Sequence, residues 1–303
     1  MFQHIVDGTT QGAIYALIAL GYTLVYGILG MINFAHGEVY MIGAYIGIIS
    51  LAVFTATGMT LISLPLCVFV AFLAALFFCA AYGYTIEKTA YRPLRQAHIL
   101  APLISAIGMS TFLQNYVMLA HGKDKFDFPG IFRAAFINNT VQISGARVNY
   151  LEIFIIAASL VTMLCLHLMI RYTRIGKAMR ATAQDKKMAG LVGININRVI
   201  PFTFIVGSAL AAIAGVMVSM YVGATKFDDG YMAGMKAFTA AVLGGIGNIT
   251  GTMLGGFILG LAESMGIWLI SSDYKDAYSF ILLLIVLIVR PRGLLGEQVS
   301  DRA

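Results

Sequence analysis

The sequence predicts an all-α fold, a polytopic bundle of transmembrane helices. Of its 303 residues, 59% are hydrophobic and only 11% are charged, whereas soluble domains carry about a quarter charged residues. Asp, Glu, Lys and Arg are absent from the long stretches 8–37, 39–86, 96–122, 153–170, 199–225 and 237–262. Continuous apolar runs of this kind are typical of membrane helices, and they exclude the alternating strands of a membrane β-barrel.

The apolar runs divide into about eight hydrophobic segments, because a helix needs about 20 apolar residues to cross the hydrocarbon. The run 39–86 is long enough for two crossings and has a weak point at Thr55–Thr60, before Pro65. We expect residues 1–303 to form a single transmembrane domain. The expected spans are 10–30, 37–56, 61–85, 98–120, 150–170, 199–223, a broken region at 235–270, and 276–290.

Basic residues set the predicted orientation, because cytoplasmic loops of membrane proteins are enriched in Lys and Arg. The loop near 88–95, the loop 171–198 and the tail from 290 hold 13 of the 20 basic residues, while the loops 121–149, 224–234 and 271–275 mix bases with acids. We therefore expect the first set in the cytoplasm. The order of the spans then places the N-terminus outside and the C-terminus inside.

The region 235–270 must leave the membrane on the face where it enters, since both flanking loops are predicted outside. Two alternatives stand: two helices, or a re-entrant hairpin that turns at residues 247–251, Gly-Asn-Ile-Thr-Gly. Non-helical backbone at membrane depth is tolerated only against protein or along a water-filled path. The segment therefore either packs in the core or lines a pathway.

Glycines recur at a spacing of four in this region, at Gly247, Gly251 and Gly255, which is typical of close helix packing. A similar succession of glycines surrounds Asn33 near the start of the chain. Together the two regions suggest a degenerate inverted repeat of the kind that transporters use.

Catalytic and nucleotide-binding motifs are missing from the sequence. No Gly-Lys pair is followed by Ser or Thr as in a P-loop, no HExxH or GxSxG occurs, and the five histidines and three cysteines lack metal-ligand spacing. We therefore expect no catalytic residue, no metal and no cofactor. The net charge of +6 lies mostly in the predicted cytoplasmic loops, so it does not indicate a nucleic-acid partner.

Ionisable residues inside a membrane are functional candidates, and this chain has few of them. In one interpretation, Asn33 caps the second helix with Glu38 in its first turns, and Glu263 is a hydrogen-bonded anchor within the bundle. In the other, these groups line the substrate path. The candidate pathway residues are Asn33, His36, Glu38, Gly247, Asn248, Gly251 and Glu263.

The predicted cytoplasmic loop 171–198 contains a helical segment with one apolar face, ended by Gly190 and Gly193. Its basic residues attract anionic membrane lipid, while a short apolar face suits a groove on a cytoplasmic partner protein. We favour docking to a partner. The face consists of Ala178, Met179, Ala183, Met188, Ala189, Leu191 and Val192.

Five stretches follow one another in a family-like order along nearly the whole chain. The most specific are GYTLVYGILGMINFAHGEVYMIGAY (Gly21–Tyr45) and MKAFTAAVLGGIGNITGTMLGGFILGLAES (Met235–Ser264), accompanied by Ile86–Arg95, Ile104–Tyr116 and Arg174–Ile194. In these stretches the chain resembles permeases of the branched-chain amino acid ABC transporter family, and most closely the H-type subunits of its high-affinity leucine, isoleucine and valine systems.

The resemblance implies one half of an importer in the bacterial inner membrane. A second permease subunit would pair with this chain, two ABC ATPases would bind beneath it, and a periplasmic binding protein would deliver substrate, with loop 121–149 facing that protein. ATP hydrolysis would belong to the partners, so this chain would not be an enzyme. The loop 174–194 would form the coupling helix, and Ala183-Gln184-Asp185 matches the general EAA motif of ABC permeases only in part. The candidate coupling residues are Arg174, Gly176, Arg180, Ala183, Asp185, Met188, Ala189 and Gly193.

Other functions stay open at this point. Urea and short-chain amide permeases share the core Asn-x-Ala-His-Gly-Glu, found here at residues 33–38. A stand-alone channel or secondary carrier would transport without ATPase partners. A membrane enzyme would show turnover by the purified chain, and the missing catalytic motifs argue against it.

Overall fold

The computed structural model is an all-α bundle, as the sequence predicts, and it describes residues 1–303 except 96, 99, 138–139, 144–145 and 297–303. Among the described residues, seven helices are long and apolar enough to cross a membrane. They are α1 (Phe2–Leu29), α2 (Ala35–Ala56), α3 (Leu64–Ile86), which continues through short helical turns to Leu94, α4 (Leu100–His121), α6 (Tyr150–Tyr172), α9 (Ile196–Val222) and α11 (Ile249–Leu269). The shorter helices α10 (Asp229–Gly244) and α12 (Lys275–Val289) complete the bundle.

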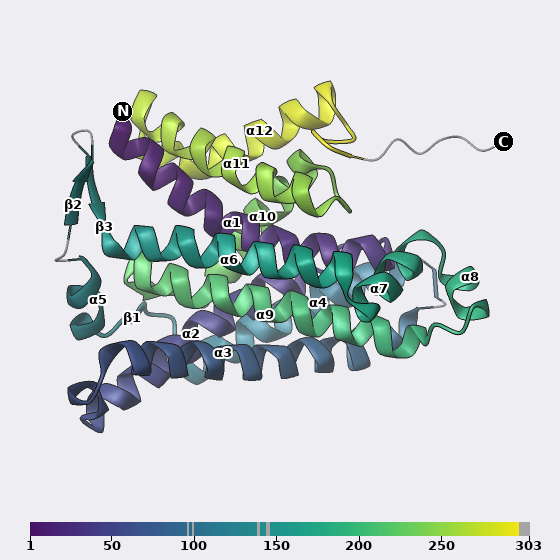
Figure 1. Ribbon diagram of the computed structural model, residues 1–303, viewed down its shortest axis with the longest axis horizontal. Coiled ribbons are helices and arrows are strands. Elements are labelled where there is room, and N and C mark those ends of the chain that lie inside the picture. The colour runs from purple at the N-terminus through teal and green to yellow at the C-terminus, as the bar shows by residue number, and fades with distance from the viewer. Residues whose placement is uncertain (96, 99, 138–139, 144–145, 297–303) are drawn as a thin grey trace.

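The connecting segments gather at the two ends of the bundle. The N-terminus lies at one end with α5 (Gly130–Ile137) and the hairpin of β2 (Thr140–Ile143) and β3 (Ala146–Asn149), as Figure 1 shows. Helices α7 (Arg174–Gln184) and α8 (Lys186–Leu191) lie at the opposite end. The mixed-charge loops and the basic loops therefore occupy opposite ends, in agreement with the predicted order of the spans.

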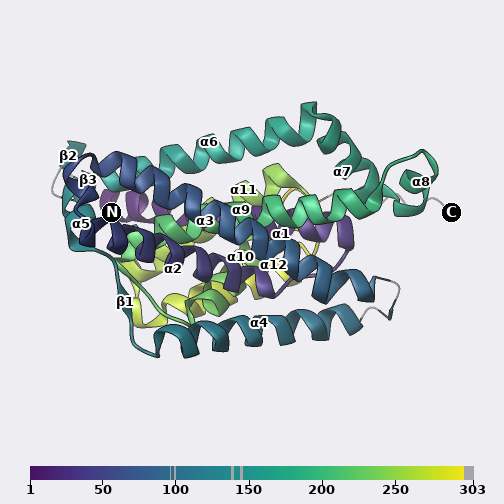
Figure 2. The same cartoon turned by 90° about the horizontal axis from the view of Figure 1, so that it is seen from below.

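Helices α1 and α9 form the centre of the bundle, because most of their residues are buried. Helices α4 and α6 lie on opposite flanks (Figure 2) and bury far fewer residues. Their outward apolar side chains remain exposed, as expected of surfaces that meet lipid or another subunit.

Small residues allow α1 and α11 to pack closely. Gly256 faces Ala16 and Gly260 faces Gly12, and a Cβ atom added at Gly256 or Gly260 would overlap the α1 backbone. On another face of α11, Gly255 packs against Ala240 of α10. The predicted close packing of the glycine-rich segment is confirmed. It explains why glycine recurs at a spacing of four residues, since a larger side chain would not fit between the helices.

The region 235–270 forms two helices, α10 and α11, joined by a tight turn, so it combines features of both alternatives. The turn lies at residues 245–248, two residues earlier than expected, because Gly245 and Gly247 adopt the positive φ values of 102° and 97° while residues 249–251 already belong to α11. The chain after α12 packs on this hairpin: the N–H of Leu294 donates to the Leu243 carbonyl at 2.8 Å. The turn therefore lies at the end of the bundle where α12 finishes.

Candidate functional site

The break between α1 and α2 is stabilised by the side chain of Asn33. Helix α1 ends at Leu29, and Gly30 turns the chain with a left-handed φ of 71°. The buried Asn33 Oδ1 accepts hydrogen bonds from the Ala35 N–H at 3.1 Å and from the Tyr91 hydroxyl at 2.9 Å. Asn33 thus stabilises the start of α2, although the N-cap residue is Phe34 rather than Asn33 as one interpretation expects, and it links this start to the chain that follows α3.

His36 joins α2 to α1. Its Nε2 lies 3.2 Å from the Ile18 carbonyl oxygen, and its ring meets the edge of Tyr22 with centroids 4.8 Å apart. Gly21 makes room for the imidazole, because a Cβ atom at that position would overlap it. The contacts of His36 are therefore those of a packed helix–helix contact.

Glu38 is a fully buried carboxylate close to the first turns of two helices. It belongs to the first turn of α2, and its neighbour across the contact is Gly230 in the first turn of α10. Ser110 of α4 donates to Glu38 Oε1 at 3.0 Å, and Oε2 has no hydrogen-bond partner among the described residues. The positive ends of helix dipoles favour an anion at such a place.

Asn248 and Gly251 shape the hairpin turn. Asn248 Oδ1 accepts from the Gly251 N–H at 2.9 Å and so caps α11, while its Nδ2 donates to the Leu295 carbonyl at 2.8 Å. Gly247 lies close to Gly27 near the end of α1. The turn and the α1–α2 break thus lie at the same end of the bundle. Asn248 caps α11 and binds the chain that follows α12.

Glu263 belongs to a buried ionic cluster that joins four helices. Lys236 Nζ lies 2.5 Å from Glu263 Oε1 and 2.7 Å from Asp276 Oδ1, and the Tyr15 hydroxyl donates to Glu263 Oε2 at 2.8 Å. Sequence reasoning proposed Glu263 and did not identify its partners Lys236, Tyr15 and Asp276. The available signal was a pair of opposite charges within one apolar hairpin, since a buried charge needs a partner.

The predicted single apolar face in loop 171–198 is wrong, because the segment is split into two helices. Asp185 ends α7 and caps α8, its Oδ1 accepting from the N–H groups of Lys187 at 2.7 Å and Met188 at 3.0 Å. Met179 and Ala189 are buried against the protein. Only the apolar residues Met188, Leu191 and Val192 form an exposed apolar tip, with 58%, 80% and 73% of their surface exposed.

The other candidate coupling residues have diverse surroundings. Gly176 packs against the backbone of Met169 and Ile170 in α6, and Arg180 donates to the Arg171 carbonyl at 3.3 Å. Arg174 and Ala183 are exposed. Gly193 follows α8 with a φ of 88°, whereas Gly190 lies inside that helix and does not end it as expected.

Lys186 links α8 to the end of α1, a contact that sequence reasoning missed. Its Nζ donates to the carbonyl of Leu29 at 3.1 Å. Burial, together with the nearby positive charge of Arg95, lowers the pKa of Lys186. Arg95 itself pairs with Glu87 and donates to Asn197 Oδ1 at 2.9 Å. Lys186 thus attaches α8 to the α1–α2 break, and Arg95 joins the chain after α3 to the start of α9.

In loop 121–149, Phe126 and Phe128 are directed inward. Phe128 is buried, and Phe126 stacks on Tyr45 with centroids 5.7 Å apart. The short strand β1 (Phe126–Asp127) pairs with β4 (Ala224–Thr225). Asn138 and Asn139, which sequence reasoning associated with a partner contact, lie outside the described residues.

Comparison with known proteins shows a close family likeness. Residues 4–288 match the model of a family described as the permease component of branched-chain amino acid transport systems. The chain is 49% identical over 300 residues to two high-affinity branched-chain amino acid transport system permease proteins, BraD of Pseudomonas aeruginosa and LivH of Escherichia coli, covering 99% of this chain and 97% of each relative. It is 26% identical to a probable branched-chain amino acid transport permease of Methanocaldococcus jannaschii, covering 92% of this chain and 88% of that protein.

Proposed function

Because the chain belongs to the family of branched-chain amino acid transport permeases, we propose that it is the membrane half of an importer driven by ATPases that bind at α7 and α8. It is a multi-pass membrane protein and a permease subunit for branched-chain amino acids. The names of its relatives favour these substrates over urea and short-chain amides. Catalysis of ATP hydrolysis is assigned to the partner subunits.

The exposed apolar tip of α8 carries the proposal. Met188, Leu191 and Val192 are exposed, and α8 lies at the end of the bundle where the basic loops gather (Figure 1). Contiguous apolar residues at such a place indicate a protein interface, and short helices that enter grooves are a common form of one. We infer that each ATPase presents a groove to such a tip, one on this chain and one on a second, paired permease subunit.

The contacts of α7 and α8 explain how ATPase movement would reach the membrane helices. Lys186 connects α8 to the end of α1, and Gly176 allows α7 to pack directly on α6. A push on the tip would therefore move α1 and α6 together. The Asn33–Tyr91 hydrogen bond would carry the displacement from the α1–α2 break to the chain that follows α3.

The proposed orientation follows the positive-inside rule. The end with α7 and α8 would face the cytoplasm, and the end with the N-terminus, α5 and the β2–β3 hairpin would face the periplasm of a bacterial inner membrane. A periplasmic binding protein would then deliver leucine, isoleucine or valine to that second end. The inward Phe126 and Phe128 of loop 121–149 would support this surface rather than contact the partner.

The proposal is tested by co-purification and by transport in vesicles. Leu191→Asp should abolish retention of the ATPases, because a charge cannot enter an apolar groove without loss. Leu61→Asp is the matched control, since Leu61 is 89% exposed in the loop between α2 and α3.

Gly193→Pro should abolish ATP-driven leucine uptake while the affinity of the binding protein for leucine stays unchanged, because proline cannot adopt the positive φ of Gly193. Leucine uptake by the chain without any ATPase would contradict the proposal and indicate a stand-alone carrier.

A further inference from the structure

Helix α4 carries two stripes of residues at the spacing of packed helices, one on each side. Its buried inner stripe consists of Ala106, Ser110, Leu113 and Val117. Its exposed outer stripe consists of Ile104, Gly108, Thr111, Asn115 and Leu119. The first four members of the outer stripe each lie two positions before a member of the inner stripe. Since two residues turn a helix by about 200°, the outer stripe lies on the side of α4 away from the bundle.

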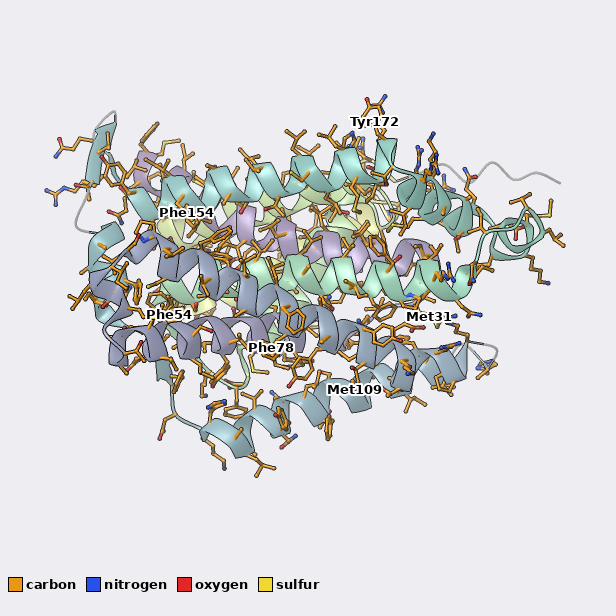
Figure 3. All side chains as sticks on the ribbon, turned by 60° about the horizontal axis from the view of Figure 1, so that its bottom comes forward. Met31, Phe54, Phe78, Met109, Phe154 and Tyr172 are labelled. Carbon is orange, nitrogen blue, oxygen red and sulfur yellow. The ribbon has the colours of Figure 1, made fainter. Side chains whose placement is uncertain are left out.

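The inner stripe already has its neighbours within this chain. Ser110 donates to Glu38 of α2 at 3.0 Å, and Met109, which Figure 3 labels on α4, packs toward the core. Figure 2 shows α4 at the flank of the bundle, with the other membrane helices to one side of it. The outer stripe is therefore a second packing face whose neighbour is not part of this chain.

The outer stripe places polar groups in the middle of a membrane span. Thr111 lies at the middle of the 22 residues of α4, and Asn115 follows about one turn later. At 1.5 Å per residue, Asn115 lies about 6 Å from the middle of the helix, inside a hydrocarbon layer about 30 Å thick. Its described hydrogen bond runs from Nδ2 to the Thr111 carbonyl at 2.8 Å, which leaves Oδ1 for a donor from outside the chain. Lipid tails supply no donor.

The middle parts of other exposed faces are apolar. Helix α3 exposes Phe69, Leu73 and Phe77, and α6 exposes Leu160, Val161 and Leu164. These faces suit lipid tails. Among the seven spans of the described residues, α4 has both the lowest hydropathy and the smallest buried share. A helix that is both the most exposed and the least apolar is better explained by a protein neighbour than by lipid.

We propose that the second, paired permease subunit packs on the outer stripe of α4. A helix of that subunit could approach closely at Gly108, because a Cβ atom added there would meet no atom within 4 Å. Asn115 Oδ1 would accept a hydrogen bond from a polar side chain of that helix, and Ile104 and Leu119 would pack above and below. Small residues and hydrogen-bonding side chains on one face are typical of contacts between membrane helices. The inference rests on the proposed function, because it assumes a paired subunit.

Two other neighbours of this face are lipid and a water-filled path. Lipid would leave Asn115 Oδ1 without a donor. A water-filled path would supply one, but it would also expose Ile104, Phe112 and Leu119 to water, and these side chains are 68%, 63% and 83% exposed in this chain. A partner helix covers the apolar groups and pairs the polar one, and for that reason we favour it.

Photo-cross-linking tests this surface without knowledge of the partner's sequence. The photoreactive amino acid p-benzoylphenylalanine replaces Ile104 or Leu119, at the two ends of the outer stripe, in the complete transporter in native membranes. Val161 of α6 is the control position, since it is 60% exposed on the opposite flank. Irradiation should join this chain to the second permease several-fold more at Ile104 and Leu119 than at Val161.

The cross-linking outcomes separate the inference from the proposed function. If the transporter takes up leucine and neither stripe position gives a protein adduct, the inference is overturned and the proposed function stands. An adduct with the second permease at Val161 alone overturns it in favour of α6, and an adduct with another copy of this chain overturns it in favour of a contact between identical chains. Leucine uptake by this chain without any partner overturns both.

A substitution at Asn115 tests the hydrogen bond separately. The purified complex is diluted into detergent, and the detergent-to-protein ratio at which half of the second permease is lost is measured. Asn115→Leu should lower this ratio by about 3- to 30-fold, as expected for one hydrogen bond between membrane helices. Gln114→Leu is the matched control, since it removes the same amide group from the neighbouring position outside the stripe, and it should leave the ratio unchanged.

Two further measurements show that the loss is specific to pairing. Asn115→Gln should recover part of the retention, because it keeps an amide oxygen on this face of α4. The unfolding midpoint of this chain purified alone should be the same for Asn115→Leu as for the unsubstituted chain, since Asn115 is exposed there. Equal retention in Asn115→Leu and Gln114→Leu would overturn the role assigned to Asn115.

Discussion

The ammonium group of Lys236 lies 2.5 Å from a carboxylate oxygen of Glu263, within the hairpin formed by α10 and α11. Both side chains are almost fully buried, with exposures of 7% and 0%, so each charge relies on the other. We predict that Lys236→Met lowers the free energy of unfolding by about 3–5 kcal/mol, because it leaves Glu263 unpaired. The measurement is the thermal unfolding midpoint of the purified protein in detergent.

The double variant Lys236→Met/Glu263→Gln provides the control for this pair. It removes both buried charges, while Asp276, whose side chain is 56% exposed, can be solvated by water. Replacing both members of a buried pair is often far less costly than removing one, so most of the lost stability should return. A double variant as unstable as Lys236→Met alone would contradict the assigned role of the pair.

Close packing of α1 on α11 is tested at Gly256. Gly256→Ala places a methyl group against Ala16 and should destabilise the protein by about 1–3 kcal/mol, the usual cost of overfilling a packed interface. Gly108→Ala is the matched control, since nothing lies within 4 Å of the added Cβ atom in α4. That variant should be neutral or slightly stabilising, because alanine is the better helix former. Equal unfolding midpoints for the two variants would argue against the packing described.

The Tyr91–Asn33 hydrogen bond gives a third prediction. Tyr91→Phe removes the hydroxyl that donates to Asn33 Oδ1, so the protein should lose about 0.5–1.5 kcal/mol of stability, together with part of its ATP-driven uptake. Tyr84→Phe serves for comparison, since Tyr84 of α3 is 43% exposed and should tolerate the change. If uptake by Tyr91→Phe equals that of the comparison variant, the hydrogen bond does not transmit movement between these helices.

The membrane helices could be predicted from the sequence because a long apolar run is a local signal. The hairpin turn begins two residues before the predicted position, and the reason is equally local. Gly245 and Gly247 both adopt positive φ, while Asn248 already caps the next helix with its side chain. A polar residue three positions before Gly251 is itself a recognisable start signal for a helix.

The contacts that connect the candidate residues could not be predicted in the same way. Glu263 was recognisable as a buried acid, but its partners Tyr15 and Asp276 come from other helices, and their proximity depends on how the bundle packs. The prediction of a single apolar face in loop 171–198 was wrong for another reason. Its apolar residues fit one helical face only if the helix continues through Asp185, and the side chain of that residue stabilises a new helix start instead.

Lys186 and Lys187 are adjacent on α8, and only the first reaches another helix. Lys186 Nζ donates to the Leu29 carbonyl, whereas the described contact of Lys187 is its backbone N–H to Asp185. We predict that Lys186→Met lowers leucine uptake per ATP hydrolysed by about 10-fold, since hydrogen bonds to charged groups contribute about 1.5–3 kcal/mol. Lys187→Met should retain normal coupling, although it removes the same charge and the same attraction to anionic lipid. Lys186→Arg should recover part of the uptake, because it can still donate to Leu29.

The measurement compares uptake with ATP hydrolysis in the same vesicles. Equal losses in both methionine variants would indicate a general effect of charge, and a parallel fall in uptake and hydrolysis would indicate lost docking rather than lost coupling.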